Sequence, residues 1–426
     1  MILWICIAIF VVLLIIGAPI ILCLGIPPIV WLLQNGKVPN MVMGQKMFSA
    51  VDSFSLMAIP FFMLAGQVME RTGITEAIVD FANSVIGWVR GGLACTVELA
   101  GMLMAGISGS SNADASALGA ICLRALKKGG YEEGWAAAIV VSASGIGPII
   151  PPSIIMIVYA TAAGLDIGQL FTAGIVPGIV LGVAYMAVSV FYAKKRGIPK
   201  VPFQGFGHVW STFKRAVWAL LMPVIIIGGI LGGLFTATEC GVIATVYGII
   251  YGFVVRKLDL KQIWESLREG ILAAVGPISL IAISSIFSYM LAREGVTASI
   301  ASFLENNIHT QFGVMAFCAI ICIIAGCFVD GTATMLLLTP IFVPVVQAMG
   351  IDMMQFSLVF MITIMSGGMT PPVGSMLFVI SSIDDTPISK MVKPVLPFMF
   401  ALIVVVILIM LIPGIASWLP GLIYAH

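Results

Sequence analysis

Both ends of this chain are long apolar segments without a single charged residue. The first charged residue is Lys37, and none follows Lys393. A transmembrane helix needs about 20 mainly apolar residues, so both ends are long enough to cross a bilayer. Charged residues make up 9% of the chain, against about 25% in a soluble domain. The pattern predicts an all-α polytopic membrane protein with about 11–14 membrane segments, and it excludes a β-barrel built from short alternating strands.

The charge balance and the cysteines exclude further classes of protein. Twenty basic and 19 acidic residues give a net charge of +1, so no nucleic-acid partner is expected. The eight cysteines lie in apolar stretches without the CxxC spacing of a zinc or redox site. We interpret them as small packing residues, and three histidines are too few for a His-rich metal site.

The basic residues predict the topology. No Lys or Arg precedes Lys37, so the charged start of a cleavable signal peptide is missing, and residues 2–23 are predicted to form a permanent first helix that begins outside. The polar segment 259–269 is typical of a helix that lies on the membrane surface. The predicted organisation is an N-terminal scaffold helix and connection (1–50), a first half (51–257), a cytoplasmic interfacial helix (258–270) and a second half (271–426).

An internal repeat of helix breaks divides the chain into these two halves. In the first half, the polar residues 108–114 interrupt an apolar run, and the Gly-rich segment 145–153, which contains Pro-Pro, follows. In the second half, residues 330–334 and then 367–374 repeat this order at a similar distance. The repeat predicts helical hairpins near 99–128 and 317–349, and broken helices near 145–153 and 367–375.

Such breaks are informative because backbone N–H and C=O groups must find partners inside hydrocarbon. Broken backbone is therefore tolerated where it is buried in protein or lines a cavity. Half-helix N-termini then offer partial positive charge to an anion, and unwound carbonyls offer oxygen atoms to a cation. Paired breaks in two halves predict the binding site of a transporter. The alternative is that Gly and Pro are simply common in membrane helices.

The residues at the breaks suit sodium, a hard cation that prefers oxygen ligands. Ser108 and Ser111 supply hydroxyl groups, and residues 147–152 supply carbonyl groups. An acidic residue at membrane depth is a functional candidate by default, although Asp114 could instead cap the following helix and Asp330 could have a structural role. Glu98 and Glu239 are equally well explained as interhelical hydrogen-bond partners or as ligands. The polar residues at the hairpin tips are Asn112, Asp114, Asp330, Thr332 and Thr334.

Five stretches resemble the large membrane (M) subunit of the tripartite ATP-independent periplasmic (TRAP) transporters, the DctM-like family. They are residues 52–73 (DSFSLMAIPFFMLAGQVMERTG), 106–119 (GISGSSNADASALG), 147–153 (GPIIPPS), 232–241 (GGLFTATECG) and 367–379 (GGMTPPVGSMLFV). Their order and spacing match from near residue 50 to near residue 400, and the set of five is specific. Ala237 and Cys240-Gly241 depart from the family pattern around Glu239, which leaves the environment of that residue open.

The resemblance implies about 11–12 transmembrane helices plus two re-entrant helical hairpins in an inverted repeat that works as an elevator. It implies sodium-coupled import of an organic acid anion, such as a C4-dicarboxylate, sialic acid, keto acid or sugar acid, across the bacterial inner membrane. A periplasmic binding protein (P) would deliver the substrate. A small four-helix membrane subunit (Q) is expected as a separate chain, because this sequence opens directly on the large subunit's first helix.

The resemblance also assigns residues to sites. The first sodium site would be formed by Ser108, Ser111, Gly147, Ile150 and Pro152. The second sodium site would be formed by Gly326, Gly367, Thr370 and Val373. The substrate would lie between the hairpin tips, near Ser110, Asn112, Asp114, Thr332 and Pro371.

Three other functions are alternatives. Residues 106–109 fit the GxSG signature of rhomboid serine proteases, but no histidine lies within an apolar helix where it would activate Ser108. A purely structural membrane subunit would leave the four breaks without a role. A sodium-coupled anion transporter that works without a binding protein shares the two-hairpin plan. The chain has no GxxxxGK[ST] loop, so it does not hydrolyse nucleotide through a P-loop.

Overall fold

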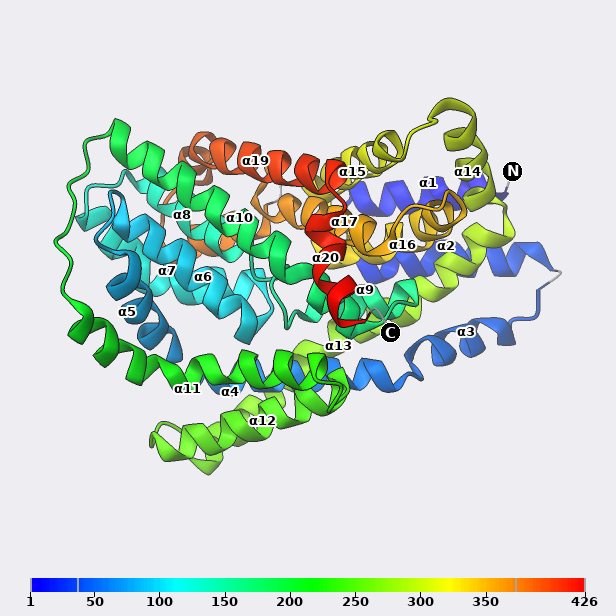
Figure 1. Cartoon of the computed structure of the whole chain (residues 1–426). Coiled ribbons are helices and arrows are strands. Elements are labelled where there is room, and N and C mark those ends of the chain that lie inside the picture. Colours follow the sequence, from blue (N-terminus) through cyan, green and yellow to red (C-terminus); the bar gives the residue numbers. More distant parts are fainter. Residues whose placement is uncertain (1, 37, 372–373, 425–426) are drawn as a thin grey trace.

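The computed structural model describes residues 2–36, 38–371 and 374–424, and the regular elements in these ranges are all helices (Figure 1). Seven of the described helices are long and apolar enough to cross a membrane, or eight if the bent pair Met41–Val51 and Phe54–Arg71 forms one span. Shorter apolar helices of 10–17 residues accompany them. The all-α polytopic fold that the apolar segments predict is therefore confirmed.

The N-terminal region contains three helices, so the prediction of one helix over residues 2–23 is wrong. Helix α1 (Ile2–Ile15) ends before Gly17, which has a positive φ of 74°, and α2 (Ile20–Asn35) begins after Pro19. The chain reverses direction at this point, so that α1 and α2 pack on each other. The Sγ atom of Cys6 in α1 donates a hydrogen bond to the carbonyl of Pro27 in α2 at 3.4 Å. Helix α3 (Met41–Val51) follows.

The same series of elements occurs twice. The first series is α5 (Ile74–Ile86), α6 (Gly92–Ser108), α7 (Ser111–Lys128), α8 (Glu133–Ser144), α9 (Ile154–Ala163) and α10 (Ile167–Lys195). The second series is α14 (Val296–Asn307), α15 (Gln311–Phe328), α16 (Gly331–Ala348), α17 (Met353–Ser366), η2 (Gly367–Met369), α18 (Ser375–Asp384) and α19 (Ile388–Leu411). In both series, two helices meet at a short polar break, and a third helix leads into a Gly-rich break.

The two series pack on each other reciprocally. Helix α7 contacts α18 while its counterpart α16 contacts α9, and α8 contacts α19 while α17 contacts α10. Ion pairs join the same partners at one end, between Lys127 and Asp384 at 2.6 Å and between Lys390 and Glu133 at 2.8 Å. Reciprocal contacts of this kind are expected of two halves related by a pseudo-two-fold axis.

Helices α3, α4, α11 and α12 and the start of α13 form a second group along the lower side of the first in Figure 1. Helix α4 contacts both α12 and α13, and α11 contacts α12 and α5. These helices are α4 (Ala58–Arg71), which follows η1 (Phe54–Met57), α11 (Phe206–Leu231), α12 (Ala237–Val254) and α13 (Leu260–Arg293). The last helix of the chain is α20 (Gly414–Ile423).

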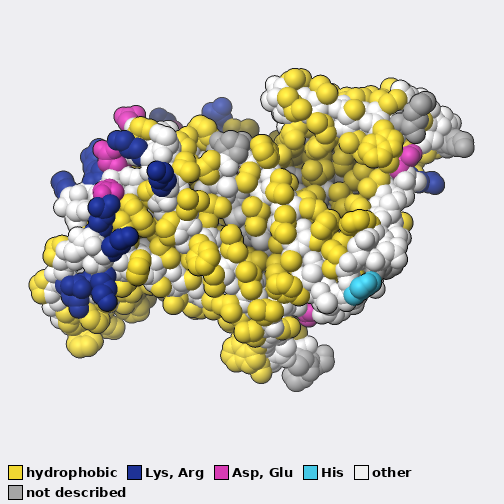
Figure 2. Space-filling view, turned by 90° about the horizontal axis from the view of Figure 1, so that it is seen from above, with side chains coloured by type: hydrophobic (Ala, Val, Ile, Leu, Met, Phe, Trp, Pro, Cys, Tyr) yellow, Lys and Arg dark blue, Asp and Glu magenta, His cyan; other side chains and the backbone are white. Residues whose placement is uncertain are grey.

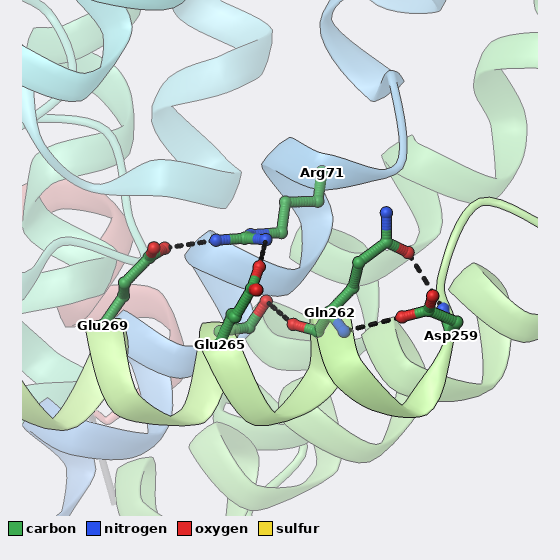
Figure 3. Close-up of polar contacts among 6 residues, drawn as sticks. Arg71, Asp259, Gln262, Glu265 and Glu269 are labelled. Carbon is green, nitrogen blue, oxygen red and sulfur yellow. Dashed lines mark hydrogen bonds and ion pairs between the residues drawn. The ribbon is translucent and has the colours of Figure 1, made fainter.

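The predicted interfacial helix over 258–270 is not a separate element. A capping box of Asp259 and Gln262 starts α13, which then continues without a break for 34 residues. The polar side chains of its first turns face α4, because Arg71 pairs with Glu265 at 3.0 Å and with Glu269 at 2.7 Å (Figure 3). Gly270 packs directly on α4 as well, since an added Cβ there would lie 2.9 Å from the Cα atom of Leu64. These contacts hold the segment against the protein.

Positive charge gathers at one end of the molecule. Figure 2 shows Lys and Arg side chains at the left end of the visible face and hydrophobic side chains over most of the rest. Helices α7 and α10 end there, with Lys127, Lys128, Lys194 and Lys195 in their last turns. The positive-inside rule predicts that this end is cytoplasmic. The N-terminus lies toward the opposite end in Figure 1.

The close contact between α6 and α8 generates a stability prediction. A Cβ added at Gly101 of α6 would lie 2.6 Å from the carbonyl oxygen of Ala143 on α8. Gly101→Ala is therefore expected to destabilise the protein by about 1–3 kcal/mol, the usual cost of overpacking. Gly228→Ala in α11 is the matched control, because an added Cβ there meets no atom within 4 Å. Thermal unfolding in lipid nanodiscs measures the stability of both variants. Equal melting temperatures would contradict the close contact between Gly101 and Ala143.

Candidate functional site

The first hairpin turns at Gly109, between α6 and α7. Gly109 has a φ of 58°, a left-handed conformation that glycine adopts without strain. A Cβ at this position would lie 2.9 Å from the carbonyl oxygen of Pro152 and 3.1 Å from the Cα atom of Ser153. The tip of the hairpin therefore packs directly against the break over residues 145–153.

Asp114 lies at the centre of this contact and is fully buried. Its Oδ1 atom accepts a hydrogen bond from the hydroxyl of Ser108 at 2.6 Å, so Asp114 is not the cap of α7. Its Oδ2 atom has no hydrogen-bond partner among the described residues. A Cβ added at Gly147 would lie 2.5 Å from Oδ2, so this oxygen faces the backbone of the break. A buried carboxylate oxygen requires a compensating partner, and a hard cation fits an oxygen-rich environment of this kind.

The break over residues 145–153 ends at Ser153, the N-cap of α9, which the sequence analysis did not identify as important. The Ser153 hydroxyl donates to the carbonyl of Pro148 at 2.8 Å and accepts from the N–H of Met156 at 3.3 Å, so it caps α9. A Ser directly before an apolar run is an N-cap signal, so the sequence contained the information. Of the predicted first sodium site, Gly147, Ile150 and Pro152 lie in this break and Ser111 begins α7.

A cavity of about 120 Å³ opens beside the hairpin tip. Ser108, Ser110 and Asp114 line one side, and Gln67 and Glu70 of α4 line the opposite side. Its charged lining residues in the described part of the chain are the two acids, Glu70 and Asp114. Sequence reasoning missed Gln67 and Glu70, because nothing in the pattern of α4 indicates which of its residues face the hairpin.

The second hairpin repeats the contact between a hairpin and a break. Asp330 caps α16, because its Oδ1 atom accepts a hydrogen bond from the N–H of Thr332 at 3.0 Å, so the structural role considered for Asp330 applies. A Cβ added at Gly326 of α15 would lie 3.3 Å from the Cα atom of Gly367. The Thr370 hydroxyl donates to the carbonyl of Ser366 at 2.7 Å. Val373, predicted for the second sodium site, lies outside the described residues.

The two breaks also contact each other. A Cβ added at Gly145 would lie 2.9 Å from the Cε atom of Met369. The predicted substrate residues are distributed differently, since Ser110 and Asp114 line the cavity whereas Asn112, Thr332 and Pro371 do not. Asn112 is exposed in the first turn of α7, and Thr332 lies in the first turn of α16.

Two further acids have structural partners. Glu98 of α6 is fully buried and accepts a hydrogen bond from the hydroxyl of Ser142 on α8 at 2.8 Å, so it connects two helices. Glu239 accepts from the N–H of Thr236 at 2.8 Å and completes the capping box of α12. Glu239 therefore stabilises the start of its own helix.

The sequence matches one known family over most of its length. Residues 7–415 match the model of the tripartite ATP-independent periplasmic transporter, DctM component. The C4-dicarboxylate TRAP transporter large permease protein DctM of Pseudomonas aeruginosa is 36% identical, with 88% of each chain covered. The 2,3-diketo-L-gulonate TRAP transporter large permease protein YiaN of Escherichia coli is 33% identical, with 87% of this chain and 88% of that protein covered.

A longer relative matches equally well. The sialic acid TRAP transporter permease protein SiaT of Haemophilus influenzae is 36% identical over 89% of this chain, which spans 62% of that protein. Among solved structures, the YdaH transporter of Alcanivorax borkumensis has a similar fold, with a TM-score of 0.64, 14% identity and coverage of 89% of this chain and 88% of that one. The relatives are transporter permeases and not enzymes, as the sequence predicts. The chain belongs to the family of large membrane components of TRAP transporters, multi-pass proteins of the bacterial inner membrane.

Proposed function

We propose that this chain imports an organic acid anion together with sodium. The substrate would arrive from a periplasmic binding protein, and a small membrane subunit would pair with this chain. The observation that carries the proposal is the fully buried Oδ2 atom of Asp114 beside Gly147, which has no hydrogen-bond partner within the described ranges. Relatives named for sialic acid, a C4-dicarboxylate and 2,3-diketo-L-gulonate support the class of substrate, because all three are organic acids.

Asp114 is better suited to the cation than to the substrate. Its Oδ2 atom faces the 145–153 break, where backbone carbonyls offer further oxygen ligands. The hydroxyl of Ser108, at the end of α6, is bonded to the other carboxylate oxygen and offers one more. We therefore assign Asp114 to the first sodium site, with Ser108, Ser111, Gly147, Ile150 and Pro152. At the second site, Gly326, Gly367 and Thr370 lie where α15 meets the second break.

Coupling between sodium and the anion follows from the charges at the cavity. Glu70 and Asp114 would repel a carboxylate, and no basic side chain is among the described lining residues. A sodium ion at Asp114 removes part of this repulsion, so each ligand favours the binding of the other. By thermodynamic linkage, this effect on affinity must be reciprocal.

The helix contacts support an elevator-like movement. The reciprocal contacts make one body of the helices that carry the hairpins and breaks, α6–α10 and α15–α19. Helices α3, α4 and α11–α13 form the group beside it and would provide the stationary scaffold. Movement of the first group would carry the site from one face of the membrane to the other.

Sodium is expected to stabilise the purified protein selectively. At twenty times the dissociation constant, a ligand of the folded state contributes about 1.8 kcal/mol. Thermal unfolding in sodium, potassium and choline at equal ionic strength measures this effect. The sodium effect should shrink in Ser108→Ala, Asp114→Asn and Thr370→Ala. It should persist in Ser299→Ala, whose exposed hydroxyl bonds the Gly295 carbonyl of its own helix. Equal stabilisation by all three cations would contradict sodium coupling at these sites.

Transport is expected to require both the sodium gradient and the binding protein. Proteoliposomes that contain this chain and its small subunit would be supplied with binding protein loaded with sialic acid, succinate or 2,3-diketo-L-gulonate. Uptake should stop when the sodium gradient is collapsed. Uptake that depends instead on a proton gradient would overturn the assigned coupling ion. Uptake without any binding protein would favour the alternative sodium-coupled anion family.

A further inference from the structure

A second, larger opening lies farther along α9 and α13, two helices that also line the cavity beside the first hairpin. This groove of about 640 Å³ runs between α13 and the helices α3, α9, α14 and α16. Four serines (Ser49, Ser284, Ser285 and Ser288) line it, together with Thr161 and Thr297. Lys46 is the charged residue among its described lining residues. The groove is therefore rich in hydroxyl groups and carries a positive charge.

The groove runs along α16, the second helix of the second hairpin. Leu336, Pro340 and Pro344 of α16 line it. Leu336 lies four residues after Thr332, so both residues share one face of the helix. A ligand that moves along the groove past Leu336 would reach the start of α16, next to the predicted substrate residue Thr332.

Two basic side chains, Lys46 and Arg293, contact the ring of Tyr289, which lines this groove. The Nζ atom of Lys46 lies 5.3 Å from the ring centre of Tyr289, and the Cζ atom of Arg293 lies 5.5 Å from the same ring. The Nε atom of Arg293 donates to the Tyr289 hydroxyl at 3.0 Å. Within the described part of the chain, neither cation forms an ion pair. The neighbouring Glu294 accepts a hydrogen bond from Trp31 at 2.7 Å instead.

The cavity beside the first hairpin has the opposite charge. Glu70 and Asp114 line it. Arg71, the cation next to Glu70 in the sequence, is engaged by Glu265 and Glu269 of α13, as Figure 3 shows. The charged side chains at the two openings therefore have opposite signs, with basic side chains at the hydroxyl-rich groove and carboxylates at the cavity.

We propose that the groove is the entrance for the carboxylate substrate, with Lys46 and Arg293 as its attracting cations. A cleft lined by one sign of charge raises the local concentration and the arrival rate of ions of the opposite sign. The groove is bordered by α3 and α14, which lie away from the basic end, on the side that the positive-inside rule assigns to the exterior. This inference rests on the proposed import of an organic acid.

The test compares how charged thiol reagents reach two introduced cysteines, and it needs no substrate. Seven of the eight native cysteines are buried, so Cys327→Ser provides the background. Ser288→Cys reports on the groove, because Ser288 lines it. The substitution removes only a hydrogen bond to the Ser284 carbonyl of the same helix. Gln67→Cys reports on the cavity. The reagents are anionic sulfonatoethyl and cationic trimethylammonium-ethyl methanethiosulfonate, applied to protein in nanodiscs and normalised to their rates with a free thiol.

The anionic-to-cationic rate ratio should be about tenfold higher at Ser288→Cys than at Gln67→Cys. Adding Lys46→Gln and Arg293→Gln together should remove most of this difference, whereas Lys128→Gln at the basic end should not. In right-side-out vesicles, the anionic reagent should label Ser288→Cys from outside. Three results would each contradict the proposal that the groove is the substrate entrance. They are equal rate ratios at the two cysteines, no response to the double substitution, and labelling from the cytoplasmic side alone. Charge-selective labelling of a protein without sodium-dependent uptake would support the groove and overturn the proposed function.

Discussion

A helix that breaks inside a membrane must satisfy its freed backbone groups within the protein, and the functional region of this chain is organised by that constraint. Each hairpin packs against the break that follows it in the sequence. Gly109 contacts the backbone of Pro152 and Ser153, and Gly326 contacts that of Gly367. Side chains satisfy several of the remaining groups, since Ser153 and Asp330 cap the helices that restart. The breaks are thus stable because they lie against one another.

The same contacts place the candidate ligands. The close approach at Gly147 is possible because this residue has no side chain, and the space is taken by a carboxylate oxygen of Asp114. The reciprocal packing of the two series then brings the first break against the second, through Gly145 and Met369. The two breaks therefore lie in direct contact with each other.

Charge distinguishes the two openings of this assembly. An acid-lined cavity faces α4, and a hydroxyl-rich groove with Lys46 faces α3 and α13. Unpaired charges are rare inside membrane proteins because desolvation is costly, and they usually mark pathways for ions or substrates. The ion pairs of Arg71 with Glu265 and Glu269 contribute to this difference, because they engage the basic side chain next to Glu70.

The membrane class, the family and the positions of the four breaks could be predicted from the amino-acid sequence, because apolar runs, Gly-rich turns and Pro-Pro steps act locally. Tertiary structure decided the roles of individual side chains. Asp114 and Asp330 both stand at hairpin tips, yet one is buried beside Gly147 and the other caps α16. The polar start of α13 resembles a surface helix until Arg71, nearly two hundred residues away, pairs with it. Partners so distant in the chain are set by helix packing, which no local pattern contains.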